Sequence, residues 1–247
     1  LDGSVAVCNH AHNGRSTETF RNEGHFDLIQ KQLRPGDFVV IQFGHNDQKH
    51  PHLQAYNGYP ENLRRFIAEI RAKKALPILA TPIARNTWTE QNGKLTYNDL
   101  LHDHAQACIA LGKELNVPVL DLHQAAMEDI IRLGRDASKI YYHQGDWTHT
   151  NDYGAVRAAG YAADALRSLG GTFPEYLPLI QAVSASIKPW KPEAALLLEK
   201  PVRLAGVKGP NGTEEGTAAQ DHQAEKDGGD ALARLLAAVQ SARGQGG

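Results

Sequence analysis

The 247-residue sequence predicts a three-layer α/β/α domain built around a parallel sheet. Four short apolar runs with many β-branched residues are typical of buried strands. Apolar residues at helical spacing fill the intervals between these runs. A strand that recurs with a helix in each interval indicates βαβ units, whose strands lie parallel in one sheet.

The predicted strands cover residues 5–8, 37–43, 76–81 and 117–121. Their short length and β-branched content favour strands over helices. Cys8 lies in the first run, and we expect it to be a buried small hydrophobic residue rather than half of a disulfide.

Helices are predicted over residues 60–70, 101–115, 125–133 and 152–169, because apolar side chains recur there three and four positions apart. The third of these should stop at Gly134, since a glycine commonly ends a helix.

The composition changes after Pro178. Residues 206–229 are rich in glycine and charged residues and carry almost no large apolar side chain, which is typical of a flexible linker. Residues 230–242 have the spacing of a terminal amphipathic helix. We therefore expect one domain over residues 1–185, followed by an irregular, flexible tail over residues 186–247.

The charge and hydropathy of the chain argue against two classes of partner. A formal net charge of -2 gives no reason to expect binding to nucleic acid or to an anionic membrane surface. No run approaches the ~20 apolar residues that a membrane-spanning helix needs. We therefore predict neither a nucleic-acid nor a membrane partner.

A polar cluster, Gly44-His45-Asn46-Asp47, directly follows the second predicted strand. Ligands bind at the carboxyl ends of strands in open α/β sheets. The NH₂ group of Asn46 could point at a developing oxyanion, and one such donor can stabilise a transition state by ~3 kcal/mol. Because Gly, Asn and Asp are also ordinary turn formers, a simple turn is the alternative.

Asp146 and His149 are three residues apart, where a loop leads into the last predicted helix. At this offset the carboxylate can accept the Nδ1–H of His149, which leaves Nε2 free to take a proton from a hydroxyl. The alternative is that Asp146 only caps the helix and that His149 is an exposed bystander.

Gly14 lies in the loop after the first predicted strand, where its backbone N–H could reach the same oxyanion. Ser16 or Thr17, with Glu18 beyond, is typical of a helix start. A helix-capping loop without chemistry is therefore the alternative for this segment.

In their order and spacing, these motifs resemble those of the SGNH (GDSL-type) hydrolases and, within them, the rhamnogalacturonan acetylesterase group. The resemblance covers about residues 3–170. It is carried by Asn9, Ala11, Gly14-Arg15-Ser16-Thr17, Phe20, Gly36-Asp37, Phe43-Gly44-His45-Asn46-Asp47, Thr81-Pro82-Ile83, Thr148-His149, Asn151 and Tyr153-Gly154-Ala155.

The resemblance implies a flavodoxin-like fold with five parallel strands and the hydrolysis of acetyl esters on pectic polysaccharide. Gly14 and Asn46 would be oxyanion donors, His149 the general base and Asp146 its orienting carboxylate. No metal or organic cofactor is implied. The partner would be an acetylated polysaccharide or oligosaccharide, and the protein would be extracellular or periplasmic.

The chain departs from this family at the nucleophile. The family's serine lies in a Gly-Asp-Ser motif at the end of its first strand, and nothing equivalent precedes Val5. Ser4 would lie at the amino end of its strand, on the opposite edge of the sheet from His149, and Ser16 belongs to a helix start. We therefore expect this chain to lack the family's first strand, helix and serine, and to be nearly inactive by itself.

Two alternatives remain open. The chain could be a non-catalytic carbohydrate-binding relative that has lost the nucleophile. Five side chains could instead bind a metal, although their spacing matches no metal-binding motif: His45, Asp47, His50, His52 and His149.

Overall fold

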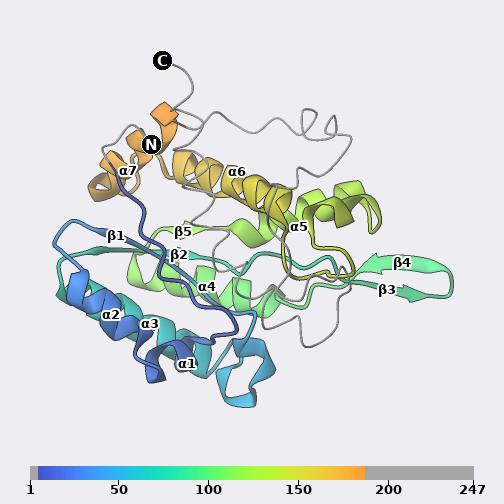
Figure 1. The fold of residues 1–247 in the computed structure, drawn as a ribbon, viewed down its shortest axis with the longest axis horizontal. Helices are drawn as coiled ribbons and strands as arrows, with labels where there is room; N and C mark the ends of the chain where they lie inside the picture. Colours follow the sequence, from blue (N-terminus) through green and yellow to red (C-terminus); the bar gives the residue numbers. More distant parts are fainter. Residues whose placement is uncertain (1–4, 187–247) are drawn as a thin grey trace, which may run out of the picture.

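The computed structural model describes residues 5–186 and has a three-stranded parallel sheet at its centre (Figure 1). The strands lie in the order β1 (Phe38–Gln42), β2 (Leu76–Ala80) and β5 (Val119–Leu120). Phe38 pairs with Leu76, and Leu79 pairs with Val119. The predicted parallel α/β architecture is confirmed.

Helices cover both faces of this sheet (Figure 1). Side chains alternate between the faces of a strand, so Leu79 packs with one group of helices while Ile78 and Ala80 pack with the other. The first group comprises α1 (Thr17–Asn22), α2 (His25–Gln32), α3 (Gly58–Ala72) and α4 (His102–Leu115). The second comprises α5 (Leu122–Leu133), α6 (Asp152–Leu169) and α7 (Leu177–Ser186).

All four predicted helices are present, and local chemistry sets their ends. The side chain of Asn57 accepts the N–H of Gly58 at the start of α3, and Pro60 lies in the first turn. Gly134, with φ +80°, ends α5 as predicted. Asn151 caps α6 by accepting the N–H of Gly154. Residues 5–186 also contain four short 3₁₀ helices: η1 (Asp47–Lys49), η2 (Pro51–Leu53), η3 (Ala137–Tyr141) and η4 (Pro174–Tyr176).

The predicted strand over residues 5–8 is wrong. Val5 and Val7 pack against the core beneath α5, α6 and α7, but Cys8 is exposed rather than buried. A strand exists only with a hydrogen-bonded neighbour, and residues 5–8 pair with none of the strands in the described chain. Within the described residues β1 is therefore an edge strand, and Val40 is 39% exposed.

A hairpin that the strand and helix patterns did not predict follows β2 at its carboxyl end. Strands β3 (Trp88–Gln91) and β4 (Lys94–Tyr97) pair antiparallel and project from the body of the domain (Figure 1). Asn92 and Gly93 both have positive φ, as a two-residue type I′ turn requires. The Asn-Gly dipeptide was therefore the sequence signal for this hairpin.

Residues 1–4 and 187–247 lie outside the described residues. They include Ser4, the predicted linker and the predicted terminal helix over 230–242. Among the helices that the structure does describe, none has the length and apolar character needed to cross a membrane.

Candidate active site

Loops from distant parts of the chain are tied together by hydrogen bonds at the carboxyl edge of the sheet. The His45 ring Nε2 donates to the carbonyl of Ile83, which joins the loop after β1 to the loop after β2. The hydroxyl of Tyr142 donates to the carbonyl of Ala84 at 3.0 Å, and this contact joins the second loop to the segment before α6. These bonds bring the segments around Asn46 and His149 to one edge of the fold.

His149 and Asp146 form a hydrogen-bonded pair in the loop before α6. Nδ1 of His149 lies 2.6 Å from Oδ2 of Asp146, and both side chains are largely buried. Because a carboxylate only accepts, Nδ1 carries the proton. Nε2 is left as the atom that can take a proton, and it makes no hydrogen bond to any residue between 5 and 186.

The other carboxylate oxygen of Asp146 holds the turn itself. Oδ1 accepts the backbone N–H groups of Thr148 at 2.6 Å and His149 at 3.1 Å. Burial alone would raise the pKa of Asp146, but the hydrogen bonds from the His149 ring and these N–H groups lower the pKa to about 2. Asp146 is therefore ionised at neutral pH, and it is not the cap of α6, which is Asn151.

The loop that carries this pair is fixed at both ends. Nδ2 of Asn151 donates to the carbonyls of Ile140 and Tyr142, at 2.9 and 2.8 Å. The N–H of Asn86, at the base of the hairpin, donates to the carbonyl of Trp147 at 2.8 Å. His149 is thus presented by a turn that hydrogen bonds hold in place.

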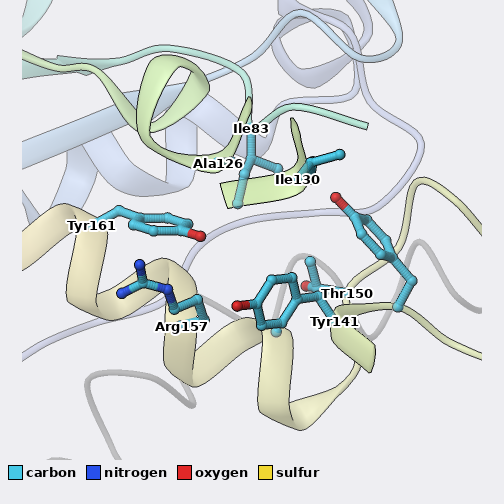
Figure 2. A pocket seen from close by; sticks show the side chains of 9 residues that line it. Ile83, Ala126, Ile130, Tyr141, Thr150, Arg157 and Tyr161 are labelled. Atoms are coloured by element: carbon cyan, nitrogen blue, oxygen red, sulfur yellow. The ribbon is translucent and has the colours of Figure 1, made fainter. Parts of the chain in front are cut away.

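Behind this loop, α5, α6 and η3 enclose a small pocket that Thr150 helps to line (Figure 2). The side chains of Tyr141, Arg157 and Tyr161 point toward it. Asp129 accepts from Arg157 at 2.6 Å and from the Tyr161 hydroxyl at 2.7 Å, so the buried charges are paired. This cluster anchors the start of α6 and, through it, the His149 loop.

Asn46 is the N-cap residue of η1, in the loop that follows β1. It caps nothing with its side chain, and Nδ2 bonds to none of the described residues. Gly44 before it has φ +131°, and a Cβ there would meet Pro82 Cγ at 3.0 Å. The strand end therefore requires glycine, and the loop leaves the amide NH₂ of Asn46 available as a donor.

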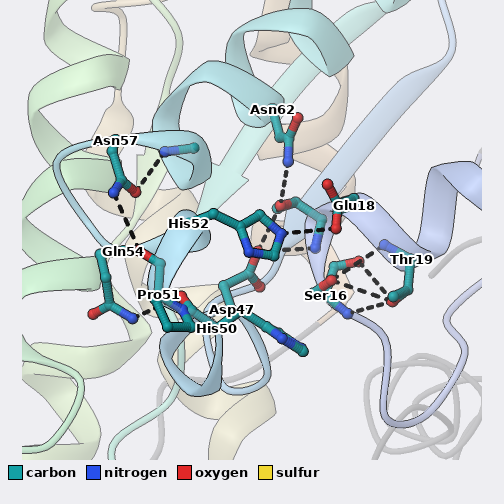
Figure 3. A network of polar contacts seen from close by, with 12 residues as sticks. Ser16, Glu18, Thr19, Asp47, His50, Pro51, His52, Gln54, Asn57 and Asn62 are labelled. Atoms are coloured by element: carbon teal, nitrogen blue, oxygen red, sulfur yellow. Dashed lines mark hydrogen bonds and ion pairs between the residues drawn. The ribbon is translucent and has the colours of Figure 1, made fainter.

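Asp47 has a structural role at the candidate site that the sequence did not indicate. Its side chain is fully buried, and it accepts from the N–H and hydroxyl of Thr17, at 2.9 and 2.5 Å (Figure 3). It also accepts from the N–H of Gly44 at 3.1 Å. Burial raises the pKa of Asp47, while the hydrogen bonds from Thr17 oppose that rise. Through these hydrogen bonds, Asp47 joins the segment that contains Gly14 to the segment that contains Asn46.

Gly14, three residues before Thr17, has a left-handed backbone conformation with φ +67°. Its backbone N–H bonds to none of the residues from 5 to 186. Ser16 caps α1, and its hydroxyl accepts the N–H of Thr19 while the Thr19 hydroxyl accepts the N–H of Ser16. The predicted helix start is confirmed, and the N–H of Gly14 has no acceptor in the part of the chain that the structure describes.

The five proposed metal ligands are not gathered into one site. Asp47 is bound to Thr17 and Gly44, His45 contacts the Ile83 carbonyl, and His52 lies 2.9 Å from Glu18 (Figure 3). Within residues 5–186, no group of three or more His, Cys, Asp or Glu side chains is arranged to hold a metal ion. The metal-site alternative is wrong for the described residues.

Three serines of the described chain make hydrogen bonds to groups other than His149. Ser16 is a buried helix cap, and the Ser138 hydroxyl donates to the carbonyl of Gly134. Ser168 donates to the carbonyl of Ala165 on α6. Among residues 5–185, no serine hydroxyl bonds to Nε2 of His149.

A second Asp–His pair, Asp99 and His123, differs from Asp146 and His149 in that neither ring nitrogen is available to take a proton. Nε2 of His123 lies 3.0 Å from Asp99 Oδ2, and Nδ1 lies 3.1 Å from the carbonyl of Pro82. Both ring nitrogens are therefore engaged, and the side chain is only 3% exposed. His123 is a structural link between α5 and the loop after β2, and it has no nitrogen free to act as a base.

Comparison with known proteins points to one family. The model of the GDSL-like Lipase/Acylhydrolase family matches residues 2–157. The rhamnogalacturonan acetylesterase RhgT of Bacillus subtilis is 33% identical over 186 residues, which are 70% of this chain and 79% of that protein. The probable rhamnogalacturonan acetylesterase YesY of the same organism is 31% identical over 194 residues, 74% of this chain and 83% of that protein.

Among solved structures, the crystal structure of YxiM from Bacillus subtilis superimposes with a TM-score of 0.56 at 28% identity. The match covers 64% of this chain and 44% of that chain, so the present chain spans less than half of YxiM.

Proposed function

The chain belongs to the GDSL-like lipase/acylhydrolase family, and from that premise we propose that it hydrolyses acetyl esters of pectic polysaccharide by serine acyl transfer. The substrate class is supported by the relatives named as rhamnogalacturonan acetylesterases. The observation that carries the chemistry is the Asp146–His149 pair: Nδ1 of His149 lies 2.6 Å from Oδ2 of Asp146, while Nε2 bonds to none of the described residues.

In the proposed mechanism, Nε2 of His149 removes the proton of a serine hydroxyl as the oxygen attacks the acetyl carbonyl. The N–H of Gly14 and the NH₂ of Asn46 donate to the oxyanion of the tetrahedral intermediate. The imidazolium then protonates the departing sugar oxygen, which leaves an acetyl-enzyme. Water, deprotonated by His149, releases acetate and restores the serine.

We propose that the serine comes from sequence outside the 247 residues, on a strand that pairs with β1. Two observations support this. Among the described residues, Nε2 of His149 has no hydroxyl partner, and β1 has no neighbour on one edge, where Val40 is exposed. An apolar edge of this kind is normally covered or paired in native proteins.

A substrate of this kind is met outside the cell, so the proposed location is extracellular or periplasmic. Trp147 fits a polysaccharide ligand, since its indole is 56% exposed two residues from His149 on a backbone fixed by Asn86. Tyr59, by contrast, is fully buried, and its hydroxyl donates to the carbonyl of Phe43.

Acetate release from acetylated rhamnogalacturonan tests the proposal. The product of the complete reading frame should turn over, while the 247-residue chain should be nearly inactive on both this polymer and p-nitrophenyl acetate. Binding of the polymer by the complete product without acetate release would favour the non-catalytic carbohydrate-binding alternative instead.

A further inference from the structure

The short helix η1 stacks the side chain of Lys49 on that of Asn46. The backbone N–H of Lys49 donates to the carbonyl of Asn46 at 3.1 Å, and Nζ of Lys49 donates to Oδ1 of Asn46 at 2.9 Å. Side chains at positions i and i+3 of a 3₁₀ helix eclipse each other, so this contact follows from the geometry of η1.

The contact decides which way the Asn46 amide faces. An ammonium group has three donors and no acceptor, so the atom that it bonds must be the amide oxygen. The NH₂ group is therefore on the side away from Lys49, and it bonds to none of residues 5–186. A rotation of the amide by 180° would bring NH₂ against the ammonium and lose this hydrogen bond.

The backbone around Asn46 has little freedom left. Asp47 is buried and bound to Thr17 and Gly44, and the N–H of Gln48 donates to the carbonyl of Gly44 at 3.1 Å. The side-chain torsions of Asn46 are thus the remaining freedom at this donor, and Lys49 supplies the contact that restricts them.

We propose that Lys49 is a positioning residue that keeps the NH₂ of Asn46 directed at the oxyanion. The inference rests on the proposed function, because it assigns Asn46 the oxyanion. Lys49 does not touch the substrate in this scheme. It acts by excluding the flipped amide, whose oxygen would repel the negative charge of the tetrahedral intermediate, and its own charge polarises the amide further.

The orientation can be tested in the 247-residue chain without activity, by following the side-chain amide ¹⁵N–¹H resonances of Asn46. Lys49→Met should shift them, whereas Lys49→Arg, which keeps the donors, should restore the wild-type positions. Lys139→Met is the matched control, because Lys139 makes the same i,i+3 contact to Asp136 in η3. Unchanged Asn46 resonances in Lys49→Met would overturn the proposal.

The catalytic consequence is tested in the product of the complete reading frame. Removing one oxyanion donor lowers kcat about 10²-fold or more, so Asn46→Ala sets the scale. Lys49→Met should lower kcat about tenfold with KM within about twofold, and Lys49→Arg should recover most of the loss.

A double variant separates positioning from a general loss of structure. If Lys49 acts through Asn46, then Asn46→Ala with Lys49→Met should be no slower than Asn46→Ala alone. Losses that multiply in the double variant would contradict the proposal. A wild-type protein without turnover would refute the proposed function, and the Asn46 resonances would still decide the role of Lys49.

Discussion

Nδ1 of His149 lies 2.6 Å from Oδ2 of Asp146, while Oδ1 of the same carboxylate accepts the backbone N–H groups of Thr148 and His149. One carboxylate therefore fixes both the tautomer of the imidazole and the turn that presents it. The Asp99–His123 pair differs, because both ring nitrogens of His123 are occupied and neither is left to take a proton.

Asp146→Asn should lower kcat of the complete protein by about 10³–10⁴-fold with little change in KM, because an amide can stabilise the wrong imidazole tautomer. Steady-state acetate release measures this. Asp99→Asn is the matched control and should lower the melting temperature while kcat stays within a few-fold. Equal losses of kcat in the two variants would contradict the assignment.

Asp47→Ala should lower the free energy of unfolding of the 247-residue chain by about 3 kcal/mol. The variant leaves the buried N–H groups of Thr17 and Gly44 without their acceptor, and each such group costs about 1–3 kcal/mol. Urea unfolding provides the measurement. Asp136→Ala, at an exposed position in an ion pair with Lys139, should change the same quantity by less than about 0.5 kcal/mol.

The stability of the chain should fall as the pH drops below about 6.5. Burial and the nearby Arg85 guanidinium lower the pKa of His45 from 6.5 to about 3. The unfolded chain therefore binds a proton at His45 that the folded chain does not, and stability declines by up to about 1.4 kcal/mol per pH unit between the two pKa values. This contribution is fully present above pH 6.5.

The free energy of unfolding at pH 7 and pH 5, measured in urea, checks this expectation. His45→Gln should reduce the difference between the two pH values, whereas His102→Gln, at an exposed position, should leave it as in the wild type. A wild-type difference that survives His45→Gln would assign the pH dependence to other groups.

Trp147→Ala should raise KM for acetylated rhamnogalacturonan about tenfold and affect p-nitrophenyl acetate much less, because only the polymer offers sugar rings to the indole. Trp147→Phe should recover part of the loss. Trp88→Phe is the comparison, since Trp88 packs edge-on against Tyr97 and donates to Asn86. Equal effects of Trp147→Ala on both substrates would count against stacking.

The Asp146–His149 contact could be predicted from the sequence because it is local: donor and acceptor are three positions apart. The hydrogen bonds between Asp47 and Thr17 could not be predicted, because the two residues are 30 positions apart and only the folded sheet edge brings them together. The run over residues 5–8 has strand-like composition, but a strand also needs a partner, which composition does not report.

Covalent labelling of the complete protein with a fluorophosphonate, followed by peptide mass analysis, tests the central claim most directly. The account predicts one modified serine outside the 247 residues and labelling at least about 10³-fold slower in His149→Ala. A label on a serine within the 247 residues, or labelling that His149→Ala does not slow, would contradict it.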